Sequence, residues 1–347
     1  MAPLNYLTEW LGNLIVTTVW LVRVSRQTFA QRPLTLSKIL NIKRHVMKRL
    51  ILTILVVTML LASSFMTPAT ELKLASWNIA WLGSHEYNKR SAEHYQKLAF
   101  YAKQLDADVI ALQEVENEYW AKKVFGDEYD YYFSTKDWVQ RVGVAVKKSK
   151  GLSVEATEYK ALDVGKVRHG MDITLTQNGQ SIHLLAVHLK SGCFTNPLDQ
   201  ESVNAMPNSS DKEFRRKEAC EKLSKQIKPL EHWIDSQAAQ NNPYIVLGDF
   251  NRRFSQDIAS NLPENKGLWQ ALNDEGQEAL WSPTTSINSD CWGGYYKDYI
   301  DHFLFSPKAK AKYIEDSFKQ LVFEEKYTRD LSRNLTDHCP ISVNITL

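Results

Sequence analysis

The sequence predicts a single domain of mixed α/β type, and two observations support this prediction. Short apolar runs alternate along the chain with longer stretches that have helical periodicity. Several of the runs, such as residues 109–112 and 245–247, are apolar on both faces, which is typical of strands in a sheet that is covered on each side. The sequence shows no internal repeat and no linker long enough to separate two domains.

The elements expected from this pattern can be given in order. The predicted strands are residues 72–79, 109–113, 142–147, 171–176, 182–189, 244–247, 300–305 and 341–347. The predicted helices are residues 92–105, 118–124 and 212–240, and the predicted loops are residues 192–211 and 282–294. Pro229 is expected to kink the last helix or to begin a new one, because proline has no backbone N–H to donate.

The N-terminal region has the composition of a secretory signal peptide. Met47 is followed by two basic residues, an apolar run over residues 50–61 and small residues at 62–64. We therefore expect translation to begin at Met47, residues 47–70 to be a signal peptide, and residues 1–46 to be a wrongly included upstream stretch or a non-globular segment. The mature domain, residues 71–347, would then be secreted or periplasmic. The alternative is an uncleaved membrane anchor, with a second apolar segment at residues 10–22.

Composition and charge exclude several classes of protein. Of the 347 residues, 44% are hydrophobic and 24% are charged, which is too apolar for a disordered chain. Residues 1–70 hold eight of the 42 Lys and Arg residues and one of the 40 Asp and Glu residues, so the rest of the chain has 34 basic and 39 acidic side chains. A mildly acidic domain does not bind polyanions through its overall charge, and a metal ion or local basic patches must do so.

All four cysteines follow the apolar N-terminal segment. An even number of cysteines in an exported chain favours two disulfides, and the absence of any C-x-x-C spacing argues against a structural zinc site. Of the three possible pairings we expect Cys193–Cys220 and Cys291–Cys339. The alternative is that Cys220 is a buried thiol, because it shares an apolar stripe with the residues of the predicted helix 212–240.

Polar side chains stand at the ends of the buried strands, where their burial is costly without a function. They follow four of the strands and precede two others: Asn78, Gln113, Glu114, His188, Asp249, Asn251, Asp301, Asp337 and His338. If the last two strands run antiparallel to the first four, all of these groups gather on one rim. Such a rim suits a hard divalent cation and acid–base chemistry. Each residue alone has an ordinary alternative as a cap, a turn residue, a surface charge or a core histidine.

The same residues lie in motifs that resemble those of the endonuclease/exonuclease/phosphatase superfamily, in its pancreatic deoxyribonuclease-like form and as an exported bacterial-type member. The motifs are WNIAWLG (77–83), LQEVEN (112–117), VHLKSG (187–192), GDFN (248–251), YIDHFLFS (299–306) and TDHCPIS (336–342). The superfamily also includes apurinic-site endonucleases, inositol-polyphosphate phosphatases and bacterial sphingomyelinases. The resemblance implies a four-layered α/β sandwich, in which two mixed β-sheets pack face to face with helices on the outside.

The resemblance also implies roles for particular residues. Glu114 resembles the principal metal ligand, with Asn78 beside it and Asp337 as a neighbouring carboxylate on the metal side. The cofactor implied is Mg²⁺, with Mn²⁺ or Ca²⁺ as alternatives.

The residues proposed for catalysis come from the other motifs. Asp249 and Asn251 match the pair that orients the nucleophilic water and holds the phosphoryl oxygens. His338, paired with Asp301, matches the catalytic histidine. His188 matches a histidine that contacts the phosphate.

Basic residues near these motifs are candidates for binding the substrate. Arg168 precedes a predicted strand at a place where the superfamily often has a phosphate-binding arginine. Lys190 follows His188, and Arg252 and Arg253 follow the GDFN motif. Each has ordinary solvated surface charge as its alternative.

The expected function is that of a metal-dependent phosphodiester hydrolase, namely an exported nuclease that cleaves DNA, or also RNA, with little sequence preference. The aromatic segment 292–299 would stack on bases, or would simply pack its own loop. The alternatives are a phosphomonoesterase, a sphingomyelinase-like enzyme that cleaves phospholipids, and a non-enzymatic surface protein on the same scaffold. The expected partner is nucleic acid, with no stable protein partner, and with membrane contact only through an uncleaved N-terminal segment.

Overall fold

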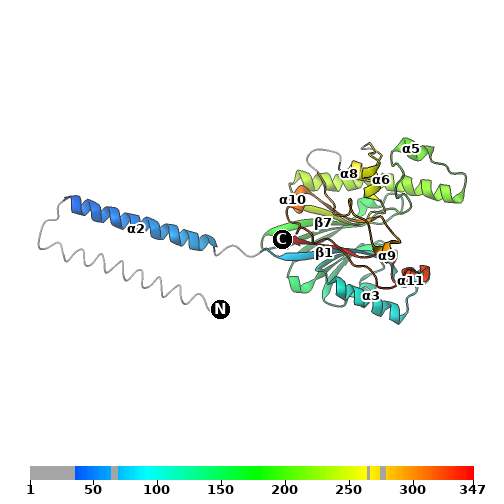
Figure 1. Cartoon of the computed structure of the whole chain (residues 1–347), viewed down its shortest axis with the longest axis horizontal. Coiled ribbons are helices and arrows are strands. Elements are labelled where there is room, and N and C mark those ends of the chain that lie inside the picture. The colour runs from blue at the N-terminus through cyan, green and yellow to red at the C-terminus, as the bar shows by residue number, and fades with distance from the viewer. Residues whose placement is uncertain (1–35, 64–68, 264–265, 274–278) are drawn as a thin grey trace. The chain divides into compact units, whose positions relative to one another are not determined.

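The structure is a computed structural model, and it describes residues 36–63, 69–263, 266–273 and 279–347. The chain divides into two units, Met1–Pro68 and Ala69–Leu347. The first unit contains helix α2 (Leu36–Ser63), which includes Met47 and most of the expected signal segment (Figure 1). Among the described residues, no helix is both long and apolar enough to cross a membrane. The start of translation at Met47 stays a prediction, and the apolar segment 10–22 lies outside the described residues.

The second unit is built on two mixed β-sheets. The first sheet has the strand order β10-β11-β1-β2-β4-β3, and the second has the order β5-β6-β7-β8-β9. The strands of the first sheet are β1 (Glu71–Leu82), β2 (Val109–Val115), β3 (Tyr129–Phe133), β4 (Arg141–Lys147), β10 (Lys319–Gln320) and β11 (Ile341–Thr346). Those of the second are β5 (Ser153–Tyr159), β6 (Gly170–Gln177), β7 (Gln180–His188), β8 (Tyr244–Asp249) and β9 (Asp301–Phe305). All eight predicted strands are present.

Three strands were not expected from the sequence. Strands β3 and β5 each lie at the edge of a sheet, and β10 is a two-residue strand at the other edge of the first sheet. Most side chains of β5 are exposed or only half-buried, so this strand lacks the continuous apolar run that marks a buried strand. Edge strands with polar side chains are hard to distinguish from loops by hydrophobic pattern alone.

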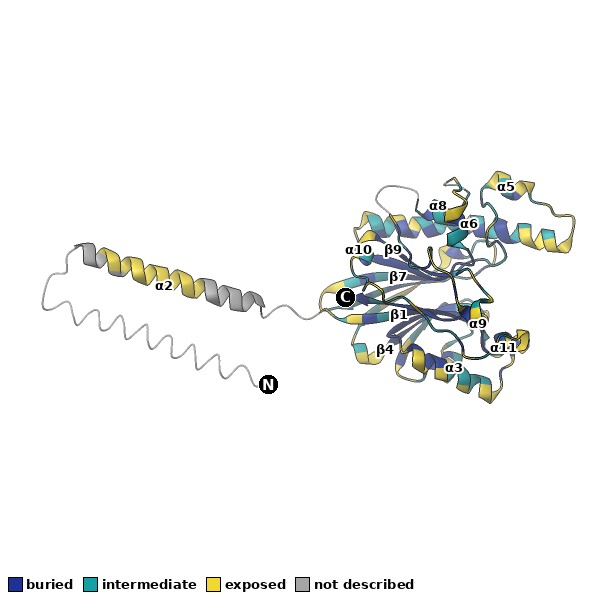
Figure 2. Ribbon diagram, viewed as in Figure 1, coloured by how far each residue is buried: buried dark blue, intermediate teal, exposed yellow. Residues whose placement is uncertain are grey.

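The two sheets pack face to face, and apolar side chains from both form the central core. Leu74 and Ala111 of the first sheet lie in the same cluster as Leu184, Ile245 and Phe303 of the second. Strands β1 and β2 are in contact with β7 and β8 across this core. The strands are largely buried in Figure 2, whereas the helices expose their outer sides. The predicted sandwich of two sheets between helices is therefore confirmed.

Helices cover the outer face of each sheet. Helices α3 (Ala92–Leu105) and α4 (Glu118–Phe125) bury Leu98 and Ala121 against Trp77 and Leu112 of the first sheet. The second sheet is covered mainly by α6 (Asp211–Ala239), whose Leu223 and Leu230 pack against Leu185 and Val246. The shorter helices are α5 (Gln200–Ala205), α7 (Phe254–Ala259), α8 (Leu268–Leu272), α9 (Cys291–Gly294), α10 (Pro307–Lys310) and α11 (Arg329–Asn334).

Helix α6 begins at a capping box and continues past its proline. The Ser210 side chain accepts a hydrogen bond from the backbone N–H of Glu213, and the Glu213 side chain accepts one from the N–H of Ser210. Pro229 lies inside the helix rather than at the start of a new one. The expectation of a new helix at Pro229 is therefore not met, because the apolar face of α6 continues on both sides of the proline, through Leu223 and Leu230.

Both predicted disulfides are present. Cys193–Cys220 connects the segment after β7 to helix α6, and the two cysteines are 27 residues apart in the sequence. Cys291–Cys339 connects α9 to the segment before β11, at a separation of 48 residues. Cys220 is therefore a disulfide partner and not a free buried thiol, and no cysteine of the chain is left unpaired.

The strand directions bring the polar strand ends to one rim. Strand β1 is parallel to β2 and antiparallel to β11, and β7 is parallel to β8, which is antiparallel to β9. In the second sheet His188 is paired with Asp249, and Asp249 is paired with Asp301. The carboxyl ends of four strands and the amino ends of two thus meet as expected.

Candidate active site

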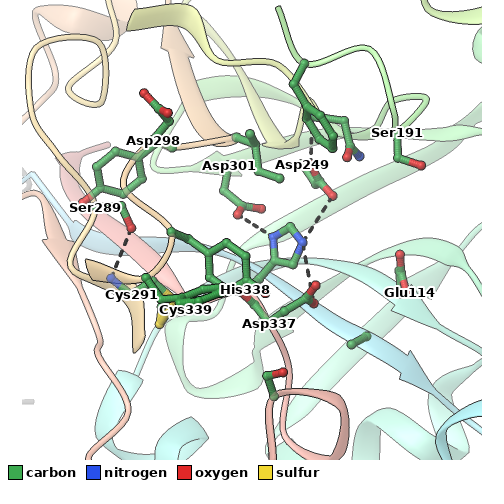
Figure 3. A pocket seen from close by; sticks show the side chains of 18 of the residues that line it. Glu114, Ser191, Asp249, Ser289, Cys291, Asp298, Asp301, Asp337, His338 and Cys339 are labelled. Atoms are coloured by element: carbon green, nitrogen blue, oxygen red, sulfur yellow. Dashed lines mark hydrogen bonds and ion pairs between the residues drawn. A yellow bond between two sulfur atoms is a disulfide. The ribbon is translucent and has the colours of Figure 1, made fainter. Parts of the chain in front are cut away.

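A cavity of about 660 Å³ opens at this rim between the two sheets. Figure 3 shows the side chains that line it, including three carboxylates arranged around the imidazole of His338. The predicted site residues that line the cavity are Glu114, His188, Asp249, Asn251, Asp301, Asp337 and His338. The fold thus brings Glu114 and His338, which are far apart in the sequence, to the same cavity.

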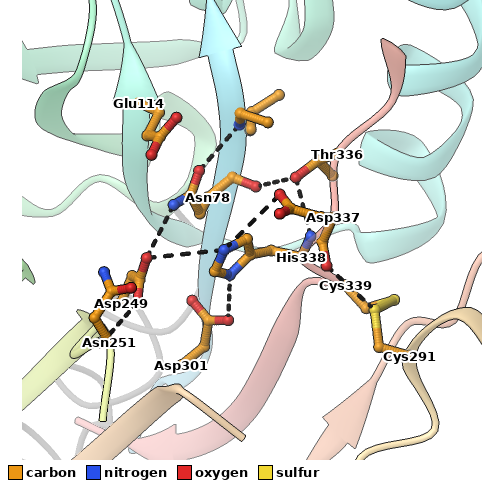
Figure 4. A network of polar contacts seen from close by, with 12 residues as sticks. Asn78, Glu114, Asp249, Asn251, Cys291, Asp301, Thr336, Asp337, His338 and Cys339 are labelled. Carbon is orange, nitrogen blue, oxygen red and sulfur yellow. Dashed lines mark hydrogen bonds and ion pairs between the residues drawn. A yellow bond between two sulfur atoms is a disulfide. The ribbon is translucent and has the colours of Figure 1, made fainter. Parts of the chain in front are cut away.

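Asp249 contacts Asn78, Asn251 and His338 in the polar network drawn in Figure 4. Its Oδ2 atom accepts a hydrogen bond of 3.0 Å from Nδ2 of Asn78, and its Oδ1 atom accepts one of 2.8 Å from the backbone N–H of Asn251. Gly248 before it has a φ of 140°, and a side chain there would collide with the carbonyl group of Val187. Burial, together with the nearby charge of Asp301, raises the pKa of Asp249 to about 7.

His338 is held between carboxylates. Its Nδ1 atom lies 2.7 Å from Oδ2 of Asp301, and its Nε2 atom lies 3.8 Å from Oδ2 of Asp249 and 4.0 Å from Oδ1 of Asp337. Burial by itself lowers the pKa of His338, but the charges of Asp301 and Asp249 outweigh it and raise the pKa well above its usual value. The ring is therefore held as an imidazolium whose Nε2–H faces the cavity.

Thr336 positions the segment that carries His338. Its hydroxyl donates a hydrogen bond of 2.7 Å to the backbone carbonyl of Asn78 and accepts one of 3.1 Å from the backbone N–H of His338. Arg90, which was not singled out from the sequence, reinforces this connection. Its guanidinium donates to five backbone carbonyls, those of Ile79, Ala80, Trp81, Asn334 and Leu335. The end of β1 and the segment before His338 are thus tied together.

Glu114 enters the cavity from the irregular end of β2. The ladder between β1 and β2 shifts register near this residue, and Glu114 has a φ of 59°. One carboxylate oxygen, Oε2, accepts a hydrogen bond of 3.1 Å from the backbone N–H of Trp81, and the other, Oε1, lies 3.7 Å from Nε2 of His188. Burial raises the pKa of Glu114 above its usual value.

Half-buried Arg168 and buried His188 form a pair beside Glu114. The Nη2 atom of Arg168 lies 2.5 Å from Nε2 of His188 and donates a hydrogen bond of 2.9 Å to the carbonyl of Leu189. Because a guanidinium only donates, Nε2 of His188 is the acceptor and its proton is on Nδ1. Burial and the charge of Arg168 lower the pKa of His188 well below its usual value, so this histidine is neutral.

Three predicted substrate-binding residues do not line the cavity: Arg168, Lys190 and Arg252. Arg252 is fully buried, with Nη2 2.6 Å from Oδ1 of Asp257 and Nη1 donating to the carbonyls of Cys193 and Asn196. This differs from the expected contact with substrate, because every side of the guanidinium is enclosed by protein. Lys190 is half-buried, and its Nζ donates to the carbonyl of Ser191 rather than projecting into the cavity.

The predicted candidate Arg253 and part of the aromatic segment 292–299 also line the cavity, and so does Arg333, which the sequence did not single out. Arg253, which follows the buried Arg252, lies at the rim with its Nε 3.5 Å from Oδ2 of Asp298. Exposed Arg333 and the two tyrosines Tyr295 and Tyr296 lie there too. Within the aromatic segment 292–299, Trp292 is instead buried and donates a hydrogen bond to the carbonyl of Thr336.

The residues around His338 fit a divalent cation. Asp249, Asp301 and His338 have possible ligand atoms that all lie within 4.8 Å of one another, and His338 can act as a ligand only after it loses the proton on Nε2. The Oδ1 atom of Asp301 is buried and has no hydrogen-bond partner among the described residues. Carboxylate oxygens are the ligands that hard divalent cations prefer. The expected ligands Glu114 and Asp337 lie on the same cavity but outside this compact group.

Comparison with known proteins assigns the chain to a family and agrees with its fold. The sequence profile of the Endonuclease/Exonuclease/phosphatase family matches residues 75–338, and the chain belongs to this family. Members of this family are enzymes that hydrolyse phosphoric esters, and this protein is such an enzyme. No curated protein matches the sequence.

Solved structures are similar to the chain at low sequence identity, and one of them, with a TM-score above 0.5, shares its fold. An endonuclease/exonuclease/phosphatase from Bacteroides vulgatus is 14% identical, with a TM-score of 0.53 over 80% of this chain and 99% of that one. TDP2 from Caenorhabditis elegans is 20% identical, with a TM-score of 0.48 over 80% of this chain and 75% of that one. The AP endonuclease LMAP from Leishmania major is 14% identical, with a TM-score of 0.48 over 80% and 88%.

Proposed function

We propose that the protein is an exported, divalent-cation-dependent nuclease that hydrolyses phosphodiester bonds, with DNA as the favoured substrate and with little sequence preference. The observation that carries this proposal is the placement of His338 and Asp249. Their facing atoms, Nε2 and Oδ2, are 3.8 Å apart at the wall of an open cavity whose rim bears arginine and tyrosine side chains. A phosphodiester has one charged phosphoryl group and two bulky ester substituents, which an open cavity accommodates.

The pair supports general acid–base chemistry on a phosphoryl group. Asp249 has a pKa near neutrality, so its Oδ2 is suited to orient an attacking water and to accept its proton. The imidazolium of His338 donates from Nε2 to a phosphoryl oxygen as negative charge develops there. Asp301 fixes the ring through Nδ1, and Asn78 and Asn251 fix the carboxylate of Asp249.

A divalent cation at this site would supply positive charge that neutralises the phosphoryl oxygens. We propose Glu114 as its principal ligand, with Asn78 and Asp337 on either side. The compact group of Asp249, Asp301 and His338 is the alternative holder. A Glu114→Gln variant distinguishes the two: weakened binding of Mn²⁺ supports Glu114 as the ligand, and unchanged binding favours the compact group.

The rim supports contact with a nucleic-acid backbone. Arg253 and Arg333 lie on the cavity, and arginine is well suited to phosphate oxygens because its guanidinium donates two parallel hydrogen bonds. Tyr295 is exposed and stacks against Tyr327 with ring centroids 3.9 Å apart, which leaves an aromatic surface beside the cavity. Contacts to phosphate and to ring faces carry little sequence information, which agrees with low sequence preference.

The experiment that tests this proposal compares substrates on the full chain. Plasmid DNA, RNA, sphingomyelin vesicles and p-nitrophenyl phosphate are each incubated with protein and Mg²⁺, and again with a chelator. We expect plasmid DNA to be cleaved, and cleavage to stop with the chelator. Faster turnover of sphingomyelin or of the monoester than of DNA would overturn the proposed substrate class. A His232→Ala variant, which changes an exposed histidine on α6, is the matched control for variants of His338.

Export is a part of the proposal that needs its own test. It is supported by the composition of residues 47–70 and by the two disulfides, which persist in oxidising compartments. The measurement is mass spectrometry of the N-terminus of the protein recovered outside the cytoplasm. We expect the mature chain to begin between residues 63 and 70, and a chain that keeps residues 1–46 would contradict this.

A further inference from the structure

Four aromatic side chains form a connected cluster at the edge of the active-site cavity, here called the aromatic platform: Trp81, His85, Tyr87 and Trp138. The ring of Trp81 lies 4.8 Å from that of His85, 5.2 Å from that of Tyr87 and 5.9 Å from that of Trp138, measured between centroids. Tyr87 is 59% exposed and Trp138 is 49% exposed. Large aromatic side chains are usually buried, so an exposed cluster of this kind is a candidate binding surface.

The backbone presents the central ring of the platform in an unfavourable conformation. Trp81 has a φ of 62° and Ala80 before it has a φ of 38°, values that are rare for residues other than glycine. The backbone N–H of Trp81 donates to Oε2 of Glu114, and its carbonyl accepts from Nη1 of Arg90. Strained conformations of this kind cluster at functional sites, where surrounding contacts maintain them. The platform is therefore fixed directly to Glu114, the proposed metal ligand.

The platform extends between two cavities. Trp81 and Tyr87 line the active-site cavity, and Trp138 lines a neighbouring cavity of about 300 Å³. The second cavity is also lined by basic side chains, among them Arg141 and Arg168. Arg168 joins the two cavities, because its guanidinium reaches His188 in the first. At the other end of the platform, the guanidinium of Arg333 lies 5.8 Å from the ring of Tyr87.

We propose that the aromatic platform stacks the unpaired bases of single-stranded nucleic acid next to the phosphate that is cleaved, so that the enzyme prefers single strands and unpaired ends to duplex. This inference rests on the proposed nuclease function. In a duplex both faces of each base are covered by its neighbours, whereas an unstacked base offers a free ring face to an aromatic side chain. Arg333 lies at one end of the platform and Arg168 and Arg141 line the cavity at the other, so the phosphates on both sides of the stacked bases have guanidinium partners.

Charge complementarity favours nucleic acid over an apolar surface as the occupant. The platform is flanked by guanidinium groups at both ends, and these provide partners for phosphates spaced along a strand. Its rings also contact one another with interplanar angles between 46° and 68°, so they form an uneven surface with several ring faces.

Binding is tested on the full chain in the presence of a chelator, so that no substrate is consumed. The probes are a labelled oligothymidylate and a labelled hairpin duplex of equal charge, followed by fluorescence anisotropy. We expect the unmodified protein to bind oligothymidylate more tightly than the duplex. Tyr87→Ala and Trp138→Ala each remove an exposed ring, so both variants should fold. Each should bind oligothymidylate roughly tenfold more weakly, with a much smaller effect on the duplex.

Phe100→Ala is the matched control, because Phe100 is 50% exposed on α3 and lines neither cavity. It should bind both probes as the unmodified protein does. Equal binding of the two probes by the unmodified protein would overturn the inference, and so would unchanged oligothymidylate binding by both platform variants. The inference would also be overturned if the two platform variants lost binding to phospholipid vesicles but bound oligothymidylate as the unmodified protein does.

Cleavage assays on the unmodified protein test the platform inference separately from the nuclease function on which it rests. Cleavage of duplex plasmid without any single-strand preference would leave the nuclease proposal standing and contradict the platform inference. Absence of cleavage of any nucleic acid in Mg²⁺, together with turnover of a phosphomonoester, would contradict the nuclease proposal. The binding experiment would then decide separately whether the platform recognises unstacked bases.

Discussion

The Nδ1 atom of His338 lies 2.7 Å from Oδ2 of Asp301, although 37 residues separate them in the sequence. The two residues stand just before β11 and at the start of β9, which belong to different sheets. Their contact therefore joins the two halves of the sandwich at the cavity. It also places a carboxylate behind a histidine, which orients the ring and stabilises its protonated form.

Replacement of Asp301 by asparagine is expected to lower kcat by about a hundredfold or more, with a small effect on KM. The reason is that a neutral amide at this position would no longer stabilise the imidazolium of His338, while the substrate-binding rim is unchanged. Steady-state kinetics on a phosphodiester measure this. Asp298→Asn is the control for kcat, since Asp298 is also a carboxylate on the cavity but contacts Ser255, Gln256 and Arg253 rather than His338. Equal losses in the two variants would contradict the assigned role of Asp301.

Substitution by alanine should lower the stability of the protein at Arg252 and its affinity for DNA at the adjacent Arg253. Arg252→Ala leaves the carboxylate of Asp257 buried without its charged partner, which is expected to cost about 3–5 kcal/mol of unfolding free energy. Arg253→Ala should leave the unfolding free energy nearly unchanged and weaken DNA binding. Urea denaturation and a DNA-binding titration measure both quantities. A stable Arg252→Ala protein with weak DNA binding would reverse the two assignments.

The two disulfides should differ in their effect on activity. Each closes a loop whose constraint on the unfolded chain contributes about 4 kcal/mol to stability in the chain-entropy model. Cys339 directly follows His338, so replacing Cys291 and Cys339 by serine should lower both the melting temperature and kcat. Replacing Cys193 and Cys220 should lower mainly the melting temperature. Thermal unfolding and kinetics below the transition distinguish the two double variants, and a larger loss of kcat in the second would contradict the prediction.

Stability at acid pH should depend on Glu158 of strand β5. Burial alone raises the pKa of its carboxyl, but hydrogen bonds from His169 and Thr135 outweigh this and lower the pKa from 4.5 to about 2. A depressed carboxyl pKa contributes stability above the unfolded value, and this contribution is lost as the pH falls through the folded value. The difference in unfolding free energy between the unmodified protein and Glu158→Gln should therefore shrink between pH 4.5 and about 2. Chemical denaturation at several pH values measures it, and a constant difference would rule the explanation out.

Much of the site could be predicted from the sequence because its residues stand at strand ends. A buried strand tolerates polar groups only where the chain leaves the sheet, so Asp249, His188 and Asp301 were already marked by their positions. In the second sheet His188 is paired with Asp249, and Asp249 with Asp301, so the three residues lie side by side on neighbouring strands. The cysteine pairing could also be predicted in part, because few arrangements are possible for four cysteines.

Other features depend on backbone geometry that the pattern of residues does not reveal. Asn251 has a φ of 52°, and of the two arginines that follow it Arg252 is fully buried whereas Arg253 is half-buried at the cavity. Trp81 also has a positive φ and is half-buried, although its apolar sequence context suggests full burial. The edge strands β3 and β5 were missed because their side chains are not buried on both faces.

The central claim is that His338 and a divalent cation act together on a phosphodiester, and one kinetic comparison tests it most directly. The initial rate of plasmid cleavage in Mg²⁺ is measured for the unmodified protein, for His338→Ala and for the control His232→Ala, with circular dichroism to confirm that each is folded. We predict that His338→Ala is folded and slower by at least about a hundredfold, that His232→Ala is fully active, and that a chelator stops cleavage in both active proteins. A folded His338→Ala protein that cleaves plasmid at the normal rate would contradict the account.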